Sequence, residues 1–137
     1  MPLMQWSPNL SVGVEFMDAD HKRMIELINE LHEITATRRK EDILATLDEL
    51  IEVTSGHFQR EEHFMRAHDY RWYKLHHRAH EGLLEELAEF RERTAAEDIE
   101  LGQELTRFLD EWLVSHILES DKHLGGFLEG VAAHPPE

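Results

Sequence analysis

Two pairs of metal-competent side chains lie at helical spacing on faces that should be buried. The first pair is His57 and Glu61, and the second is His76 and His80. Residues four apart in an α-helix are separated by about 40° around the axis and one turn along it, so each pair projects from one face. Burying an imidazole or a carboxylate is costly unless the group is hydrogen-bonded, ion-paired or bound to a metal. Each pair therefore predicts half of a metal site.

Apolar residues that recur in steps of three and four define those faces and predict four amphipathic helices, over residues 18–36, 41–67, 70–93 and 97–124. Both metal-competent pairs fall on these stripes. In chain order the stripes contain Met17, His21, Met24, Ile28, Leu31 and Thr35; Ile43, Leu47, Leu50, Thr54, His57 and Glu61; Tyr73, His76, His80, Leu83, Leu87 and Phe90; and Leu101, Leu105, Leu109, Trp112 and His116.

Local signals suggest where the helices begin and end. Asp18 and Asp69 are plausible N-caps for the first and third helices. The run Thr94-Ala95-Ala96-Glu97 has the spacing of a capping box and predicts the start of the fourth. Gly125-Gly126 should end or break that helix.

Helices of this length joined by short polar breaks run antiparallel to their neighbours. The predicted fold is therefore all-α, an antiparallel up-down-up-down four-helix bundle with an ordered N-terminal arm. Residues 1–17 form the arm, and residues 131–137 are expected to be a loose tail. The length of 137 residues fits one domain, 1–137, that buries a substantial core. Four apolar residues should anchor the arm: Trp6, Leu10, Val12 and Val14.

Composition excludes several classes of function. There are 29 acidic residues against 14 basic ones, a formal net charge of −15, so nucleic acid and anionic membranes are poor partners. The absence of cysteine excludes disulfides, zinc–thiolate sites, iron–sulfur clusters and cysteine nucleophiles. The eleven histidines are a high number for this length. Sites for metals that prefer nitrogen and oxygen ligands are therefore not excluded. No signal sequence or membrane span is evident, and we expect a cytoplasmic protein.

The fourth helix leaves one candidate ligand undecided. Asp121 follows His116 by five residues, about 500° of rotation, which places it about 140° from His116 on an ideal helix. A π-bulge, which lengthens one turn by a residue, would return Asp121 to the face of His116. His123 lies on the ideal stripe without any distortion. Helical geometry by itself therefore favours His123.

The full pattern resembles the hemerythrin family, specifically the bacterial single-domain hemerythrins. The resemblance rests on His21, His57-x-x-x-Glu61, His76-x-x-x-His80 and His116-x-x-x-x-Asp121, and it extends to about Leu128. The arm matches through Trp6-Ser7, Val12-Gly13-Val14 and Met17-Asp18-x-Asp20-His21. Because seven ligand positions match in spacing, the resemblance is specific, and it selects Asp121 over His123.

The resemblance implies a non-haem di-iron centre that binds O2. His76, His80 and His116 would hold one iron ion, and His21 and His57 the other. Glu61 and Asp121 would bridge the two, together with a solvent-derived oxo or hydroxo group. Six ligands then surround the first iron and five the second, which leaves one position open for O2. Five apolar residues close to the ligands are expected to line a dry O2 pocket: Met24, Phe58, Trp112, Leu113 and Ile117.

Reversible O2 binding for storage, delivery or sensing, rather than enzymatic activity, is the function that the resemblance implies. An oxidative di-iron enzyme, such as a peroxidase or ferroxidase, is the alternative. It is weakened because ferritin-like di-iron proteins use paired Glu-x-x-His motifs, which this chain lacks. A structural zinc site would not need seven ligands. We expect a monomer whose ligand is O2, with an O2-consuming enzyme as its partner and neither nucleic acid nor membrane bound.

Overall fold

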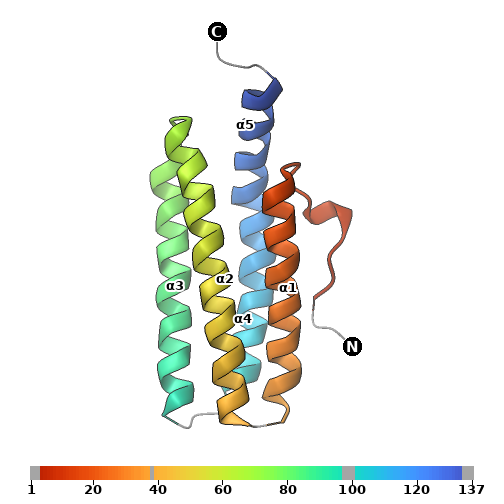
Figure 1. Cartoon of the computed structure of the whole chain (residues 1–137), viewed down its shortest axis with the longest axis vertical. Coiled ribbons are helices and arrows are strands. Elements are labelled where there is room, and N and C mark those ends of the chain that lie inside the picture. The colour runs from red at the N-terminus through yellow and green to blue at the C-terminus, as the bar shows by residue number, and fades with distance from the viewer. Residues whose placement is uncertain (1–3, 38, 97–100, 134–137) are drawn as a thin grey trace.

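The structure is a computed structural model that describes residues 4–37, 39–96 and 101–133. Its long helices are α1 (Glu15–Thr35), α2 (Lys40–Ala67), α3 (Tyr73–Ala95) and α4 (Leu101–His116). A π-helical turn, η2 (Ile117–Asp121), links α4 to α5 (Lys122–Ala133), and the three form one continuous rod (Figure 1). A short 3-10 turn, η1 (Pro8–Leu10), lies in the N-terminal arm.

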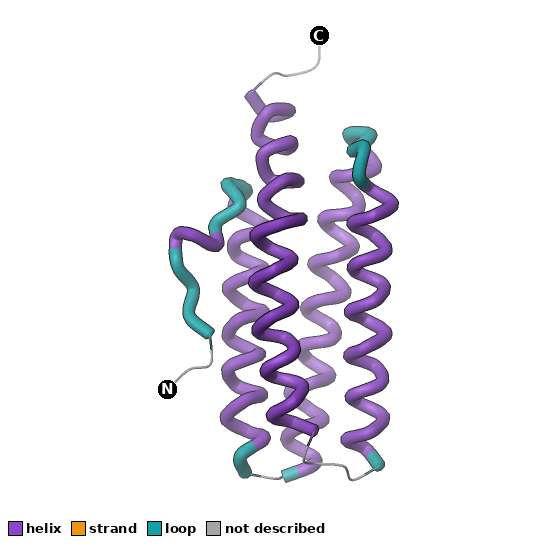
Figure 2. Tube along the Cα trace, turned by 180° about the vertical axis from the view of Figure 1, so that it is seen from behind, coloured by secondary structure: helices purple, strands orange, loops and turns teal. Residues whose placement is uncertain are grey.

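The helices form a closed four-membered bundle. Helix α1 packs against α2 and α4, and α3 packs against α2 and α4. Viewed from behind, the helices lie side by side (Figure 2). The predicted all-α, up-down-up-down bundle is confirmed. Within the ranges that the structure describes, none of the helices combines the length and apolar character needed to span a bilayer.

The predicted stripes face the core of the bundle. Every stripe residue of α1 and α2 is buried. In α3 only Tyr73 is half-buried, and in α4 Trp112 is half-buried while Leu105, Leu109 and His116 are buried. The period of three and four residues therefore placed histidines and carboxylates inside the bundle together with leucine and isoleucine.

Asp18 fastens the N-terminal arm rather than capping α1. Helix α1 begins at Glu15, with Val14 at the N-cap position, so the prediction that Asp18 is the N-cap was wrong. Its carboxylate accepts hydrogen bonds from the Ser11 hydroxyl at 2.6 Å and the Val12 amide at 2.9 Å. Asp18 thus lies within the first turn of α1 and binds the arm with its side chain.

Two other boundaries also differ from the prediction. Asp69 has a φ of 51° in the connection between α2 and α3, and α3 begins only at Tyr73, because the chain reverses direction in between. Thr94 is buried in the last turn of α3 and does not start the next helix. The other end of that expected capping box, Glu97, lies outside the described residues.

The glycine pair near the C-terminus does not interrupt the helix. Helix α5 continues through Gly125 and Gly126 to Ala133, so residues 131–133 are helical and not part of a loose tail. Residues 134–137 lie outside the described residues. A Cβ atom on Gly125 would overlap the carbonyl oxygen of Val12, whereas nothing lies within 4 Å of one on Gly126. Gly125 therefore allows the arm to contact α5 closely.

Alanine substitutions at these two glycines should have opposite effects. We expect Gly125→Ala to lower the free energy of unfolding by about 1–3 kcal/mol, because the arm must shift away from α5. Gly126→Ala should raise it by up to about 1 kcal/mol through helix propensity. Urea denaturation of the two variants tests this pair, and equal stability would show that the arm does not depend on the contact at Gly125.

Candidate metal centre

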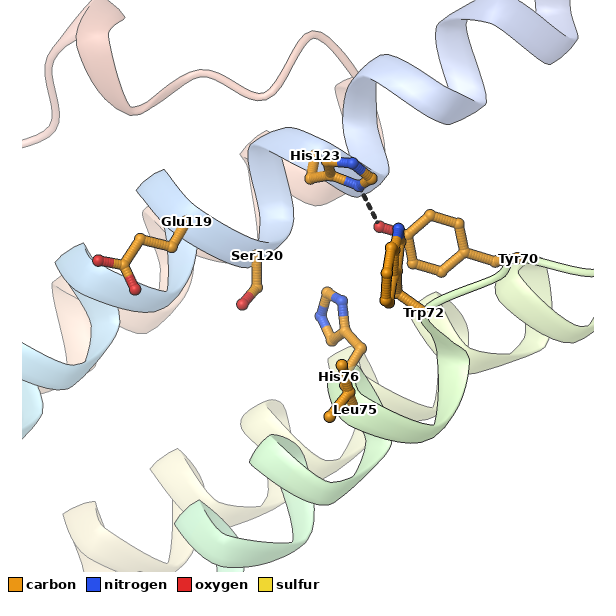
Figure 3. Close-up of a pocket in the computed structure, with 7 residues that line it drawn as sticks. All are labelled: Tyr70, Trp72, Leu75, His76, Glu119, Ser120 and His123. Carbon is orange, nitrogen blue, oxygen red and sulfur yellow. Dashed lines mark hydrogen bonds between the residues drawn. The ribbon is translucent and has the colours of Figure 1, made fainter.

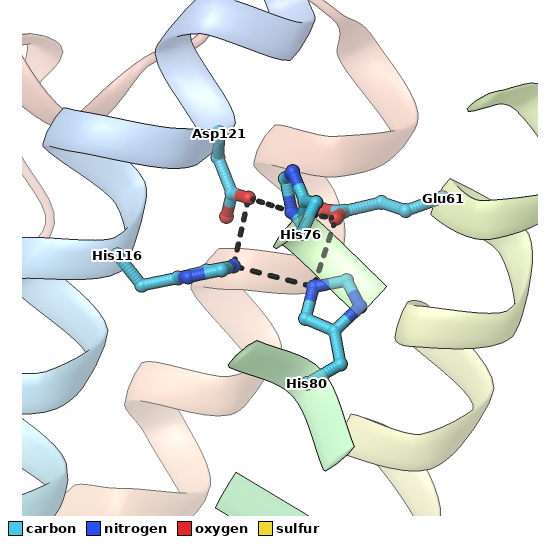
Figure 4. A group of neighbouring side chains, drawn as sticks. All are labelled: Glu61, His76, His80, His116 and Asp121. Carbon is cyan, nitrogen blue, oxygen red and sulfur yellow. Dashed lines mark hydrogen bonds and ion pairs between the residues drawn. The ribbon is translucent and has the colours of Figure 1, made fainter. Parts of the chain in front are cut away.

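All seven predicted ligands meet at one level of the bundle core. His21 comes from α1, His57 and Glu61 from α2, His76 and His80 from α3, His116 from α4 and Asp121 from η2. None of the seven residues is more than 7% exposed. Figure 4 shows five of them, from α2, α3, α4 and η2, pointing toward one another. The cluster thus requires all four sides of the bundle to be in place.

His76, His80 and His116 form what we call the three-histidine side. The Nε2 atoms of His76 and His116 lie 2.9 and 3.0 Å from Oδ1 of Asp121 (Figure 4). Those of His76 and His80 lie 3.1 and 3.4 Å from Oε1 of Glu61. His80 and His116 also bring their Nε2 atoms within 3.2 Å of each other. Three imidazole nitrogens and two carboxylate oxygens therefore surround one point.

His21 and His57 form the two-histidine side. Nε2 of His57 lies 2.5 Å from Oε2 of Glu61, and Nε2 of His21 lies 3.0 Å from Oδ2 of Asp121. These are the second oxygens of the same two carboxylates. In each of the two groups the candidate ligand atoms lie within 4.8 Å of one another. Glu61 and Asp121 thus each direct one oxygen to each side.

The cluster leaves buried polar atoms unsatisfied. Among the described residues, the buried side-chain nitrogen and oxygen atoms without a hydrogen-bond partner all belong to predicted ligands. They are Nδ1 and Nε2 of His21, Nε2 of His57 and of His76, both carboxylate oxygens of Glu61 and Oδ1 of Asp121. Unpartnered buried polar groups are rare in native proteins. A metal ion on each side would bind most of these atoms, so the donor set fits metal ions.

The charges of the cluster also favour metal binding. Burial lowers the pKa of His57, but the carboxylates of Glu61 and Asp20 outweigh it and raise that pKa to about 9. For His76, burial again acts downward and is outweighed by Asp121 and Glu61, so its pKa also rises to about 9. Burial acts to raise the pKa of Asp121, yet the neighbouring His116 holds it well below the ordinary value. Without metal, His57 and His76 therefore hold protons at neutral pH, and a metal would displace them.

The turn between His116 and Asp121 is widened, as the family pattern required. Residues Ile117–Asp121 form a π-helix, and the amide of Lys122 donates to the carbonyl of Ile117, five residues earlier. This brings Asp121 inside, at 1% exposed. His123, the alternative, is exposed at this level. Its Nδ1 forms a 2.6 Å hydrogen bond with the Tyr70 hydroxyl, beside a cavity of about 370 Å³ that reaches His76 (Figure 3).

Asp20 was not identified as a site residue from the sequence. Its Oδ2 atom accepts a hydrogen bond from Nδ1 of His57 at 2.8 Å. The same oxygen accepts from Nη2 and Nε of Arg60 at 2.7 and 3.2 Å. This arrangement fixes the tautomer of His57 so that Nε2 is free to bind metal.

Glu62 plays the equivalent part on the three-histidine side and was also missed. Its Oε2 atom accepts a hydrogen bond from Nδ1 of His80 at 3.1 Å, and its Oε1 accepts from Nδ1 of His77. Nε2 of His77 faces Glu81 at 2.5 Å. Both carboxylates, Asp20 and Glu62, immediately adjoin a predicted ligand in the sequence. That proximity was the available signal, but acidic residues are too frequent in this chain for it to stand out.

The predicted pocket residues lie among the ligands. Phe58 stacks on His80, with ring centroids 3.6 Å apart, and Trp112 stacks on His116 at 4.4 Å. Trp112 is half-buried. The other four, Met24, Phe58, Leu113 and Ile117, are at most 2% exposed. These five side chains therefore give the cluster an apolar lining, while surface cavities reach His76 and His116.

The fold and the cluster define a helical-bundle protein able to hold metal ions with histidine and carboxylate ligands. The family model "Hemerythrin HHE cation binding domain" matches residues 12–128. The chain belongs to the hemerythrin family.

Bacterial relatives and solved structures agree with that assignment. Bacteriohemerythrin of Stenotrophomonas maltophilia is 33% identical over 98% of this chain and 85% of its own length. Bacteriohemerythrin of Methylococcus capsulatus is 34% identical over 91% and 96%. A crystal structure of wild-type hemerythrin superposes with a TM-score of 0.86 at 34% identity, covering 90% of this chain and 96% of that one.

Proposed function

We propose that this chain binds O2 reversibly at a non-haem di-iron centre, for oxygen storage, delivery or sensing. The observation that carries the proposal is the division of the two bridging carboxylates between the two sides. Oε1 of Glu61 and Oδ1 of Asp121 face the three-histidine side, and Oε2 and Oδ2 face the two-histidine side. A single ion would need only one oxygen from each carboxylate.

In this proposal His76, His80 and His116 hold one iron and His21 and His57 hold the other, with Glu61 and Asp121 shared. The two-histidine side has one protein ligand fewer, which favours an open position there. When bound, the two ferrous ions supply the electrons and the coordination position that O2 requires. Asp20 and Glu62 orient the ligands His57 and His80 by hydrogen bonds. The apolar residues around the cluster exclude water.

Exclusion of water is the part played by the apolar lining. Met24, Phe58, Leu113 and Ile117 are almost fully buried, and Trp112 covers His116. A diatomic molecule without charge crosses such a lining more readily than water or an ionic reductant does. This selectivity supports a carrier, in which O2 leaves unchanged, over an oxidative enzyme, which must admit a second substrate.

Anaerobic reconstitution with ferrous iron tests the proposal. We expect two irons per chain, a visible absorption change on exposure to air, and its reversal when O2 is removed. Elemental analysis that gives one zinc and no iron, from cells grown with ample iron, would overturn the di-iron assignment. Stoichiometric O2 consumption that does not reverse, with turnover of an added reductant, would instead identify an oxidative enzyme.

Leu113 should control how long the oxygenated form survives. Leu113→Ala opens the lining to water, and we expect faster autoxidation to the ferric state with iron content unchanged. Leu109→Ala is a matched control, because Leu109 is equally buried one turn earlier and its loss costs a similar 2–5 kcal/mol of stability. Autoxidation followed by absorbance should accelerate only in the Leu113 variant. Equal rates in the two variants would mean that Leu113 does not line the pocket.

A further inference from the structure

We propose that Arg60 is a positioning residue that weakens electron donation from His57 by sharing the carboxylate of Asp20, and so slows oxidation of the two-histidine side. The inference rests on the proposed di-iron function and names a regulator of that site. Its basis is that one oxygen atom, Oδ2 of Asp20, accepts hydrogen bonds from both the His57 imidazole and the Arg60 guanidinium. The two donors therefore compete for the same negative charge.

The direction of the effect follows from the charges. A carboxylate that accepts the N–H of a metal-bound imidazole makes the ring a stronger donor, and a stronger donor favours the ferric ion. A guanidinium on the same oxygen withdraws part of that charge through a charge-assisted hydrogen bond. Arg60 also brings a permanent positive charge toward the site. Both effects favour the ferrous ion, the form that takes up O2.

The three-histidine side has a different arrangement. Glu62 supports His80 as Asp20 supports His57, but its other oxygen is held by His77. Among the described residues, no lysine or arginine forms an ion pair with Glu62. The two sides thus have matching outer carboxylates, and only the one behind His57 shares its oxygen with an arginine. The protein weakens ligand donation on the side where the open position is expected.

A purely mechanical role for Arg60 would be to hold Asp20 in place, and the two roles predict different signs. If Arg60 only orients Asp20, then Arg60→Gln and Asp20→Asn both loosen His57 and change the site in the same direction. If Arg60 shares the charge, removing it strengthens donation from His57, whereas removing the charge of Asp20 weakens it. The two variants should then shift the reduction potential in opposite directions.

The test uses the iron-loaded full chain and four variants, with redox titration and autoxidation rate as readouts. We expect Arg60→Gln to lower the reduction potential and speed autoxidation roughly tenfold, the lower end for outer-sphere changes, since the Arg60 side chain is 51% exposed. Asp20→Asn should raise the potential. Arg60→Lys should stay close to wild type. Arg60→Gln added to Asp20→Asn should lower the potential by less than Arg60→Gln does alone, because the shared carboxylate is gone and only the positive charge of Arg60 is removed.

Arg91→Gln provides the matched control. Arg91 donates two hydrogen bonds to Asp48, one to each oxygen, and within the part of the chain that the structure describes no histidine bonds to Asp48. A potential of Arg60→Gln equal to that of Arg91→Gln would overturn the inference, as would shifts of the same sign in the Arg60→Gln and Asp20→Asn variants. Both results require a wild type that loads two irons and binds O2 reversibly. A wild type that does neither would overturn the proposed function and this inference together.

Discussion

Iron is lost and the bundle is weakened when His80 is replaced by alanine; this is the expected result of the most disruptive single change at the site. His80 is 1% exposed, and its Nε2 lies 3.2 Å from that of His116 and 3.4 Å from Oε1 of Glu61. The substitution removes one of the three nitrogen ligands proposed for the first iron. It also leaves Oε2 of Glu62 without its partner and opens a void against Phe58.

The expected fall in the free energy of unfolding is roughly 2–5 kcal/mol, combining the void and the unsatisfied carboxylate. Elemental analysis and chemical denaturation measure the two effects separately. His77→Ala is the control, because His77 binds the same Glu62 through a ring that is 40% exposed and does not face the cluster. Full iron content in the His80 variant would show that His80 is not a ligand.

The second large effect is expected at Asp121. Its carboxylate lies 2.9–3.0 Å from Nε2 of His21, His76 and His116, on both sides of the cluster. In the proposed di-iron site Asp121 is shared between the two irons, so we expect Asp121→Ala to lose both and not one. The metal-free variant should also lose the ion pairs that hold these histidines.

His123→Ala separates this prediction from a general effect of changing the helix. His123 is exposed, and its partner is Tyr70. We therefore expect the His123 variant to bind iron as the wild type does. Iron bound by the Asp121 variant but not by the His123 variant would reverse the assignment and remove the second bridging carboxylate from the proposal.

These two residues also show how far sequence reasoning extends. Helical period alone placed six of the seven predicted ligands in the core, because His21, His57, Glu61, His76, His80 and His116 replace apolar residues on buried stripes. It could not locate Asp121, since a π-turn changes the phase of the helix and leaves no periodic trace. Only the family pattern selected Asp121, and the widened turn Ile117–Asp121 agrees with it.

Other features depended on contacts between segments that are distant in the sequence. Asp18 looks like a helix cap until the arm folds back onto it, and Gly125 looks like a helix end until Val12 is seen against it. Asp20 and Glu62 look like two solvated acids among many. Asp20 is identified only by its hydrogen bond to His57 on α2, and Glu62 only by its hydrogen bond to His80 on α3. Local pattern carries no information about such partners.

The predicted ligands come from all four sides of the bundle, and this affects how metal binding is linked to folding. His21 and Asp121 are one hundred positions apart, and the other ligands are spread between them. The chain has no cysteine and so no covalent cross-link. In the proposed di-iron state the ions take that place in the folded chain, joining α1, α2, α3 and the rod of α4 and α5; because the site does not exist in the unfolded chain, the free energy of metal binding adds to the free energy of folding. Removing iron with a chelator would then remove that contribution and leave the bundle held by its apolar core.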